Sequence, residues 1–245
     1  MLSYNRHMHK KLQLNVPEHQ LPITCVNFKH MMDGLLETEQ KRLATIAEEF
    51  SDGFAFIRKY PRSVTFFGSA RTAQGNVHYD QAYTLAKKIV EELGYAVVTG
   101  GGPGIMEAAN RGAYDAGGDS VGLLIKLPKE QASNPYVKDT IEFHYFFARK
   151  VVLSFAAEAY IFFPGGYGTL DEFFELVTLI QTHKIPPMPI ILIGEDFWRP
   201  LDGFIKKNVL EHHHAIAPSD THLYTITDDM NKVIDSIKHT PVNPT

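Results

Sequence analysis

The chain has 245 residues, of which 44% are hydrophobic and 21% charged, a composition typical of a soluble globular protein and unlike that of disordered or fibrous chains. Its formal net charge of −4 excludes a general electrostatic footprint for nucleic acid or for an anionic membrane, so we expect a small-molecule partner. The single cysteine, Cys25, excludes internal disulfides and Cys-rich metal sites and fits a reducing compartment such as the cytoplasm.

Neither a secretory signal nor a membrane span is expected. The N-terminal stretch MLSYNRHMHKKLQLNVPEHQ lacks the uninterrupted apolar segment of a signal peptide. The longest apolar stretch, around residues 151–163, carries Glu158 and is too short to cross a bilayer. We therefore predict a cytoplasmic protein without a membrane partner.

The first part of the chain differs from the rest. Residues 1–33 are polar, rich in histidine and interrupted by Pro17 and Pro22, which predicts an extended arm. Between residues 37 and 57, apolar side chains recur at three- and four-residue steps, which predicts an amphipathic helix. Residues 1–60 are thus predicted to form an arm and a helical extension before a main domain of residues 61–245.

In the main domain, short apolar runs alternate with segments of helical periodicity. The predicted strands are residues 63–70, 95–102, 120–125, 140–147, 159–163 and 189–194. The predicted helices are residues 79–93, 104–116, 148–157, 169–182, 197–211 and 230–238. Strands that are apolar on both faces and separated by helices are typical of a parallel sheet covered on both sides. The sequence therefore predicts a doubly wound α/β fold.

Three predicted strands run into small residues where the next helix begins. These junctions read FGSA (67–70), TGGGPG (99–104) and PGGYGT (164–169). A glycine-rich junction can simply turn the chain, and for any one loop this interpretation is favoured by about two to one. Three such loops at the carboxyl edge of one sheet reverse the preference, because that edge holds the ligand crevice of doubly wound folds. Helix N-termini there offer backbone N–H groups to an anion such as phosphate.

The absent motifs narrow the class of phosphate ligand. The G-x-G-x-x-G fingerprint of dinucleotide sites, aligned on Gly100, requires glycine where the chain has Ile105. The sequence also lacks the G-K-[ST] of a triphosphate-binding P-loop. A monophosphate ligand is the remaining prediction.

Charged residues next to these loops have two interpretations. TLDE (169–172) fits a capping box with Thr169 as N-cap and Glu172 at the third helical position, so local sequence supports a structural role for Glu172 at least as well as a catalytic one. Arg149 and Lys150 open the preceding predicted helix, where cations oppose the helix dipole and require a compensating anion. Solvated surface cations are an equally supported alternative for this pair.

GGGPGIMEAAN (100–110) and PGGYGTLDE (164–172), together with Arg149 and Lys150, resemble the LOG (Lonely Guy) phosphoribohydrolases, long labelled lysine decarboxylases. The resemblance covers roughly residues 60–210. It implies a Rossmann-like fold, a homodimer with active sites near the subunit interface, and hydrolysis of nucleoside 5′-monophosphates to free base and ribose 5-phosphate. It also implies that no metal or redox cofactor takes part.

By position, the resemblance implies that Arg149 and Glu172 are the catalytic residues. Cleavage of an N-glycosidic bond passes through an oxocarbenium-like state, which a carboxylate can stabilise or supply with an activated water. The residues implied to bind the nucleotide and its phosphate are Gly68, Ser69, Gly101, Gly102, Glu107, Lys150, Gly165, Gly166, Gly168 and Thr169.

One departure from the family pattern concerns specificity. Cytokinin-activating members usually carry Met-His where this chain has Phe146 and Phe147. We therefore expect a housekeeping purine or pyrimidine monophosphate as substrate rather than a cytokinin nucleotide. The alternative is a non-catalytic nucleotide-binding or cofactor-carrier protein on the same scaffold. The presence of both Arg149 and Glu172 favours the enzyme.

Overall fold

The computed structural model describes residues 25–126 and 133–240. Its internal contacts divide the chain into two compact units, residues 1–45 and 46–245, so the division falls within helix α1 (Cys25–Ile57). The prediction of an extended arm is wrong for residues 25–33, which belong to helix α1. The two prolines that suggested an arm both precede these residues, so they do not interrupt the helix. The rest of the predicted arm lies outside the described residues, and the domain boundary after residue 60 stays a prediction.

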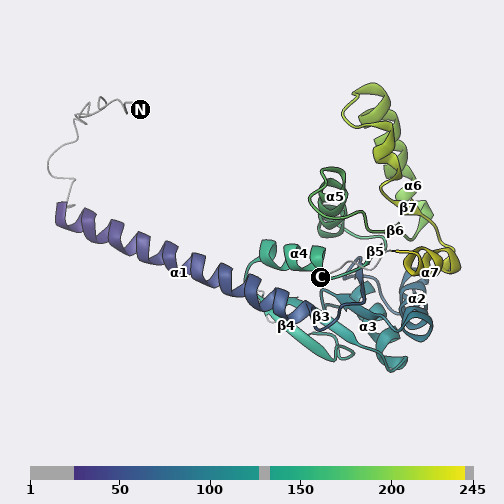
Figure 1. Cartoon of the computed structure of the whole chain (residues 1–245), viewed down its shortest axis with the longest axis horizontal. Coiled ribbons are helices and arrows are strands. Elements are labelled where there is room, and N and C mark those ends of the chain that lie inside the picture. The colour runs from purple at the N-terminus through teal and green to yellow at the C-terminus, as the bar shows by residue number, and fades with distance from the viewer. Residues whose placement is uncertain (1–24, 127–132, 241–245) are drawn as a thin grey trace. The chain divides into compact units, whose positions relative to one another are not determined.

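The second unit is built on a parallel sheet of seven strands in the order β4-β3-β2-β1-β5-β6-β7 (Figure 1). Every pair of neighbouring strands is parallel, which confirms the predicted doubly wound α/β fold. The strands are β1 (Ser63–Phe67), β2 (Ala96–Thr99), β3 (Ser120–Ile125), β4 (Asp139–Phe143), β5 (Ala159–Phe162), β6 (Ile190–Leu192) and β7 (Thr225–Ile226).

Helices cover both faces of this sheet (Figure 1). Besides α1, the helices are α2 (Val77–Leu93), α3 (Ile105–Asp115), α4 (Phe146–Phe155), α5 (Tyr167–Gln181), α6 (Glu195–Phe204) and α7 (Met230–Lys238), and a π-helical segment (Ile205–His212) continues α6. Side chains of β1 alternate between the faces: Val64 and Phe66 belong to the apolar cluster formed with α2, α3 and α7, whereas Phe67 belongs to the cluster formed with α1, α4, α5 and α6. Among the described residues, none of the helices combines the length and apolar character that crossing a membrane requires.

The order of the strands fixes where a ligand can bind. From the central strand β1 the chain builds β2, β3 and β4 on one side, then returns to place β5, β6 and β7 on the other. Such a reversal leaves a crevice at the carboxyl ends of the two strands that flank it, here β1 and β5. The two strands are held in register at this end, where the rings of Phe67 and Phe162 stack at 4.6 Å.

The start of helix α4 differs from the prediction. The strand predicted over residues 140–147 ends at Phe143, and the helix begins at Phe146. A carboxylate distant in sequence explains the change: Glu49 of α1 accepts hydrogen bonds from the backbone N–H of His144 at 2.6 Å and of Tyr145 at 3.2 Å. Because Glu49 brings a negative charge to the N-terminus of α4, it also stabilises the helix dipole there.

Candidate active site

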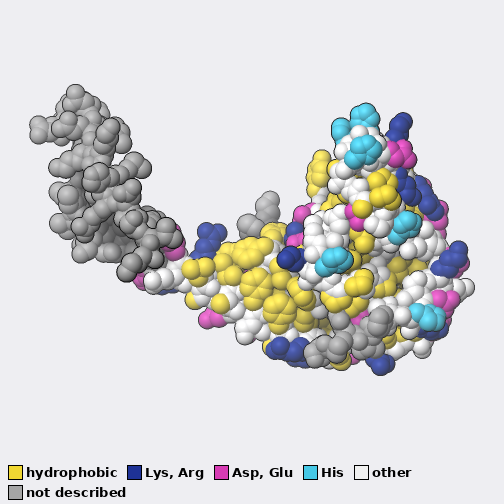
Figure 2. All heavy atoms as spheres, turned by 45° about the horizontal axis from the view of Figure 1, so that its top comes forward, with side chains coloured by type: hydrophobic (Ala, Val, Ile, Leu, Met, Phe, Trp, Pro, Cys, Tyr) yellow, Lys and Arg dark blue, Asp and Glu magenta, His cyan; other side chains and the backbone are white. Residues whose placement is uncertain are grey.

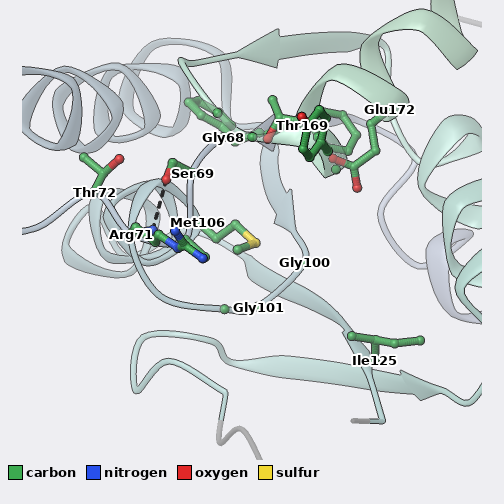
Figure 3. Close-up of a pocket in the computed structure, with 18 of the residues that line it drawn as sticks. Gly68, Ser69, Arg71, Thr72, Gly100, Gly101, Met106, Ile125, Thr169 and Glu172 are labelled. Carbon is green, nitrogen blue, oxygen red and sulfur yellow. Dashed lines mark hydrogen bonds between the residues drawn. The ribbon is translucent and has the colours of Figure 1, made fainter.

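A cavity of about 880 Å³ lies at the carboxyl edge of the sheet (Figure 3). Its walls come from the loops after β1, β2 and β5, from the end of β3 and from α4 and α5. Ten of the sequence-predicted site residues line it: Gly68, Ser69, Gly101, Gly102, Arg149, Gly165, Gly166, Gly168, Thr169 and Glu172. The structure thus brings the three glycine-rich loops to one cavity.

Two predicted residues, Lys150 and Glu107, do not line the cavity. The ammonium of Lys150 pairs with Asp171 at 2.7 Å and with Glu175 at 3.2 Å, and so links α4 to α5 outside the cavity. The carboxylate of Glu107 accepts hydrogen bonds from the Tyr79 hydroxyl at 3.0 Å and from the Gln74 side chain at 3.1 Å. Both side chains therefore connect neighbouring elements.

The N-terminus of α5 forms part of the cavity wall. The helix begins at Tyr167 with Gly166 as its N-cap, and no side chain caps it. The first hydrogen bond of the helix runs from Leu170 N–H to the Gly166 carbonyl, so the amides of residues 167–169 precede the helical ladder. The predicted capping box is wrong, because the helix starts before Thr169 and Glu172 lies beyond its first turn. These amides offer a site to an anion.

The glycines of the three glycine-rich loops have different reasons for lacking a side chain. Gly104 has a φ of +73°, and an added Cβ would clash with the Ser69 carbonyl, so backbone conformation and packing require glycine there. A Cβ at Gly166 or Gly168 would meet no atom within 4 Å. Neither position has a positive φ, so the missing side chains at these two positions keep open the space beside the α5 amides.

Arg149 and Glu172 meet across the cavity from consecutive helices. Arg149 Nη2 lies 3.8 Å from Glu172 Oε1, and the two side chains are only 13% and 17% exposed. The guanidinium also lies over the Phe146 ring at 5.6 Å, and a Cβ on Gly100 would approach its Nη1 to 3.4 Å. Its Nε is buried and has no hydrogen-bond partner among the described residues. The pair is thus tightly enclosed, yet it retains an unused donor.

Burial sets the protonation of this pair. It raises the pKa of Glu172 to about 7, because desolvation outweighs the attraction of Arg149 and Lys150 for the ionised carboxylate. Burial also lowers the pKa of Arg149, but a guanidinium stays charged at any physiological pH. Near neutral pH, Glu172 therefore exchanges readily between its acid and carboxylate forms.

This raised pKa predicts a pH dependence of stability. Between the ordinary value of 4.5 and about 7, the folded chain holds a proton on Glu172 that the unfolded chain has lost. The Glu172 contribution to the free energy of unfolding therefore falls as pH rises through that range. Glutamine does not titrate. The unfolding free energy of Glu172→Gln minus that of wild type should therefore rise by about 3 kcal/mol between pH 4.5 and pH 8.

Urea denaturation at several pH values measures this difference. Glu175→Gln is a matched control, because Glu175 lies one turn further along α5 and outside the cavity. A difference between Glu172→Gln and wild type that stays constant with pH would contradict a raised pKa at Glu172.

A buried polar network shapes the loop after β2. The Asn110 side-chain oxygen accepts hydrogen bonds from the Thr99 hydroxyl at 2.6 Å and from the Asn134 amide at 2.9 Å. Thr99 in turn accepts from Gly101 N–H at 2.8 Å, which fixes the glycine loop against α3. The sequence reasoning missed Asn110, although an amide at an otherwise apolar helical position was a usable signal.

The sequence reasoning also missed several side chains that line the cavity. Arg71 and Thr72 extend the loop after β1, directly beyond the predicted Gly68 and Ser69. Their position next to a predicted glycine junction was the available signal, and Arg71 brings a second cation to the cavity. Within residues 25–126 and 133–240, no group of three His, Cys, Asp or Glu side chains is arranged to hold a metal ion.

The amino-acid sequence of the chain is similar to those of a known protein family and its members. A family model described as "Possible lysine decarboxylase" matches residues 106–237. The chain is 30% identical over 167 residues to the probable cytokinin riboside 5′-monophosphate phosphoribohydrolase LOG6 of Arabidopsis thaliana, covering 66% of this chain and 80% of that protein. It is 25% identical over 209 residues to the probable phosphoribohydrolase LOGL6 of Oryza sativa subsp. japonica, covering 83% of this chain and 81% of the relative.

A solved structure supports the fold. The molybdenum cofactor carrier protein of Chlamydomonas reinhardtii superposes with a TM-score of 0.56 at 22% identity, covering 73% of this chain and 97% of the carrier. At this level of identity the likeness concerns the fold alone.

Proposed function

The chain belongs to the LOG family, whose model is described as "Possible lysine decarboxylase", and from this membership we propose that it hydrolyses the N-glycosidic bond of nucleoside 5′-monophosphates. The products are the free base and ribose 5-phosphate. The relatives are named for cytokinin riboside 5′-monophosphate, and we extend the substrate to AMP-like nucleotides because Phe146 and Phe147 replace the Met-His of cytokinin-activating members.

The observation that carries this proposal is the enclosed Arg149–Glu172 pair beside the free amides of α5. In the proposed reaction, water adds its hydroxyl to C1′ of the ribose and its proton ends on the departing base. The Glu172 carboxylate stabilises the positive sugar carbon or activates that water. Arg149 holds the carboxylate and can reach ribose hydroxyls with its remaining donors. The phosphate, remote from the breaking bond, positions the substrate.

A carrier protein on the same scaffold is the second candidate, since a molybdenum cofactor carrier shares the fold. A carrier requires a cavity and phosphate-binding amides, both of which are present here. It does not require a buried carboxylate with a pKa raised to about 7 beside a guanidinium. That feature supports the enzyme, because catalytic acids and bases are tuned toward the working pH.

A substrate panel tests the proposal. The purified protein is incubated with AMP, GMP, IMP, CMP and UMP and with a cytokinin riboside 5′-monophosphate, and released base and ribose 5-phosphate are assayed. Release from the common nucleotides supports a broad nucleosidase, whereas release only from the cytokinin nucleotide would contradict the extension to AMP-like substrates. Binding of a nucleotide without any release would favour the carrier.

We also propose a homodimer, as expected from the family. Three phenylalanines of α4 are unusually exposed for large apolar side chains: Phe146 at 55%, Phe147 at 48% and Phe155 at 53%. Figure 2 shows hydrophobic side chains gathered on the surface in this region. Burial of such a patch against a second copy would remove apolar surface from water. Light scattering of the purified chain measures its mass in solution: twice the mass of one chain supports the dimer, and the mass of one chain would contradict it. A cytoplasmic location stays a prediction.

The glycines of α5 give a prediction that separates ligand binding from folding. Gly168→Ala should keep or raise the melting temperature, because alanine favours the helix and the new methyl group meets no neighbour. The methyl group occupies space beside the α5 amides, so KM for AMP should rise about 10-fold. Gly104→Ala, the contrasting variant, should lose about 1–3 kcal/mol of stability. Thermal unfolding and steady-state kinetics test both, and an unchanged KM in Gly168→Ala would contradict a phosphate site at these amides.

A further inference from the structure

The cavity contains a guanidinium that the proposed mechanism does not use. Arg71 lines the cavity from the loop after β1, whereas Arg149 lines it from α4. Figure 3 shows Arg71 and Glu172 reaching into the cavity from different walls. In the part of the chain that the structure describes, no carboxylate is close enough to form an ion pair with Arg71. Its charge is therefore available to a ligand.

The charged side chains that line the cavity indicate the charge of the ligand that fits it. The charged side chains among the described lining residues are Arg71, Arg149 and Glu172. Arg149 is opposed by the ionised form of Glu172 at 3.8 Å. Arg71 then leaves the cavity with an excess positive charge, in addition to the partial charge of the α5 N-terminus. A neutral ribose or base does not require this charge, whereas a phosphate monoester carries a charge of about −1.5 to −2 near neutral pH.

Hydrogen bonds fix the Arg71 backbone next to the predicted phosphate loop. Ser69 Oγ accepts the N–H of Arg71 at 3.1 Å, and the N–H of Ser69 donates to the Pro164 carbonyl at 3.1 Å. Pro164 directly precedes Gly165 and the α5 amides. The Ser69 carbonyl also accepts from Ile105 N–H at 3.1 Å, so the loop is anchored to α3 as well. Arg71 therefore extends from a loop that is attached to both glycine-rich neighbours.

We propose that Arg71 binds the 5′-phosphate of the nucleotide together with the α5 amides and leaves Arg149 and Glu172 to the ribose and the breaking bond. This inference rests on the proposed function for the identity of the ligand. A guanidinium suits the role because its planar fork donates two parallel hydrogen bonds to phosphate oxygens. Since the phosphate is remote from C1′, Arg71 acts mainly on substrate affinity.

Calorimetric titration with ribose 5-phosphate and with adenosine tests the proposal without requiring turnover. Arg71→Ala should bind ribose 5-phosphate at least ~10-fold more weakly, the scale of a lost charged hydrogen bond. Its affinity for adenosine should stay within about twofold of wild type. Arg71→Lys should fall between the two, because it keeps the charge but loses the fork. In kinetics with AMP, Arg71→Ala should raise KM at least ~10-fold and change kcat far less.

Arg62→Ala is the matched control, because Arg62 precedes β1 at the opposite end of the same strand and outside the cavity. It should bind ribose 5-phosphate as wild type does. Wild-type affinity for ribose 5-phosphate in Arg71→Ala, or an equal loss for adenosine, would overturn the proposal, as would a wild-type protein that does not bind ribose 5-phosphate. If Arg71-dependent binding is found but no nucleotide is hydrolysed, the proposed function fails and the Arg71 assignment stands.

Discussion

Glu172→Gln is expected to bind AMP with little change in Kd and to lose at least ~100-fold in kcat. The variant keeps the size of the side chain and its contacts in the cavity, so the substrate still fits. It cannot ionise, however, and it therefore loses the negative charge that stabilises an oxocarbenium-like sugar and the base that activates water. Single-turnover measurements of released ribose 5-phosphate, together with a binding titration, separate these two effects.

Glu175→Gln provides the comparison for this result, since it makes the same chemical change one turn further along α5, where the side chain pairs with Lys150. It should retain nearly all activity. If Glu172→Gln were as active as Glu175→Gln, Glu172 would serve structure alone, although the capping role that the sequence allowed is already excluded by the start of the helix at Tyr167.

Arg149→Ala is the second variant with a large expected effect, a loss of about 100- to 1,000-fold in kcat/KM. The substitution removes the positioned guanidinium of Arg149. It also leaves the Glu172 carboxylate buried without the partner that lies 3.8 Å away in the wild type. Since Arg149 lowers the pKa of Glu172, that pKa should rise above about 7 in the variant. At neutral pH, most of the variant would then carry the inactive protonated acid.

The pH dependence of kcat/KM distinguishes this mechanism from simple loss of binding. If the carboxylate is the active form, wild-type kcat/KM should rise with pH up to about 7, and the rise should move to higher pH in Arg149→Ala. Lys87→Met is the control, because Lys87 pairs with Glu91 on α2, lies outside the cavity and is not among the charges that act on Glu172. An Arg149→Ala profile with its rise at the wild-type pH would contradict the proposed coupling of the two side chains.

The elements that could be predicted from the sequence are those determined by local pattern. Strand β3 (Ser120–Ile125) and helix α7 (Met230–Lys238) have the predicted bounds, since apolar runs and helical periodicity depend on neighbouring residues only. The start of α4 depends instead on a carboxylate from α1 that accepts from His144 and Tyr145, a contact between residues far apart in the sequence. Aromatic residues at 145–147 favour a strand locally, so the prediction extended β4 too far.

In the candidate site, too, features set by local sequence were predictable, whereas features set by tertiary packing were not. Its glycine loops were predicted because each loop is a local signal and a parallel sheet gathers such loops at one edge. The direction of individual side chains was not predictable, because consecutive helical residues point about 100° apart. Arg149 therefore faces the cavity while Lys150 faces Asp171 and Glu175, and only the packing of α4 decides between the two.

The hydrogen bonds that Glu49 accepts have a consequence for any shortened form of the chain. A truncation that starts at residue 61 would retain every strand and every glycine loop, yet it would remove the anion that caps the helix bearing Arg149. A truncation that starts at residue 46 would keep this cap, as well as the close packing of Gly53 against Val152 of the same helix. The C-terminal part of α1 therefore stabilises the helix that positions Arg149, and we expect the shortest form of the chain with the proposed activity to include it.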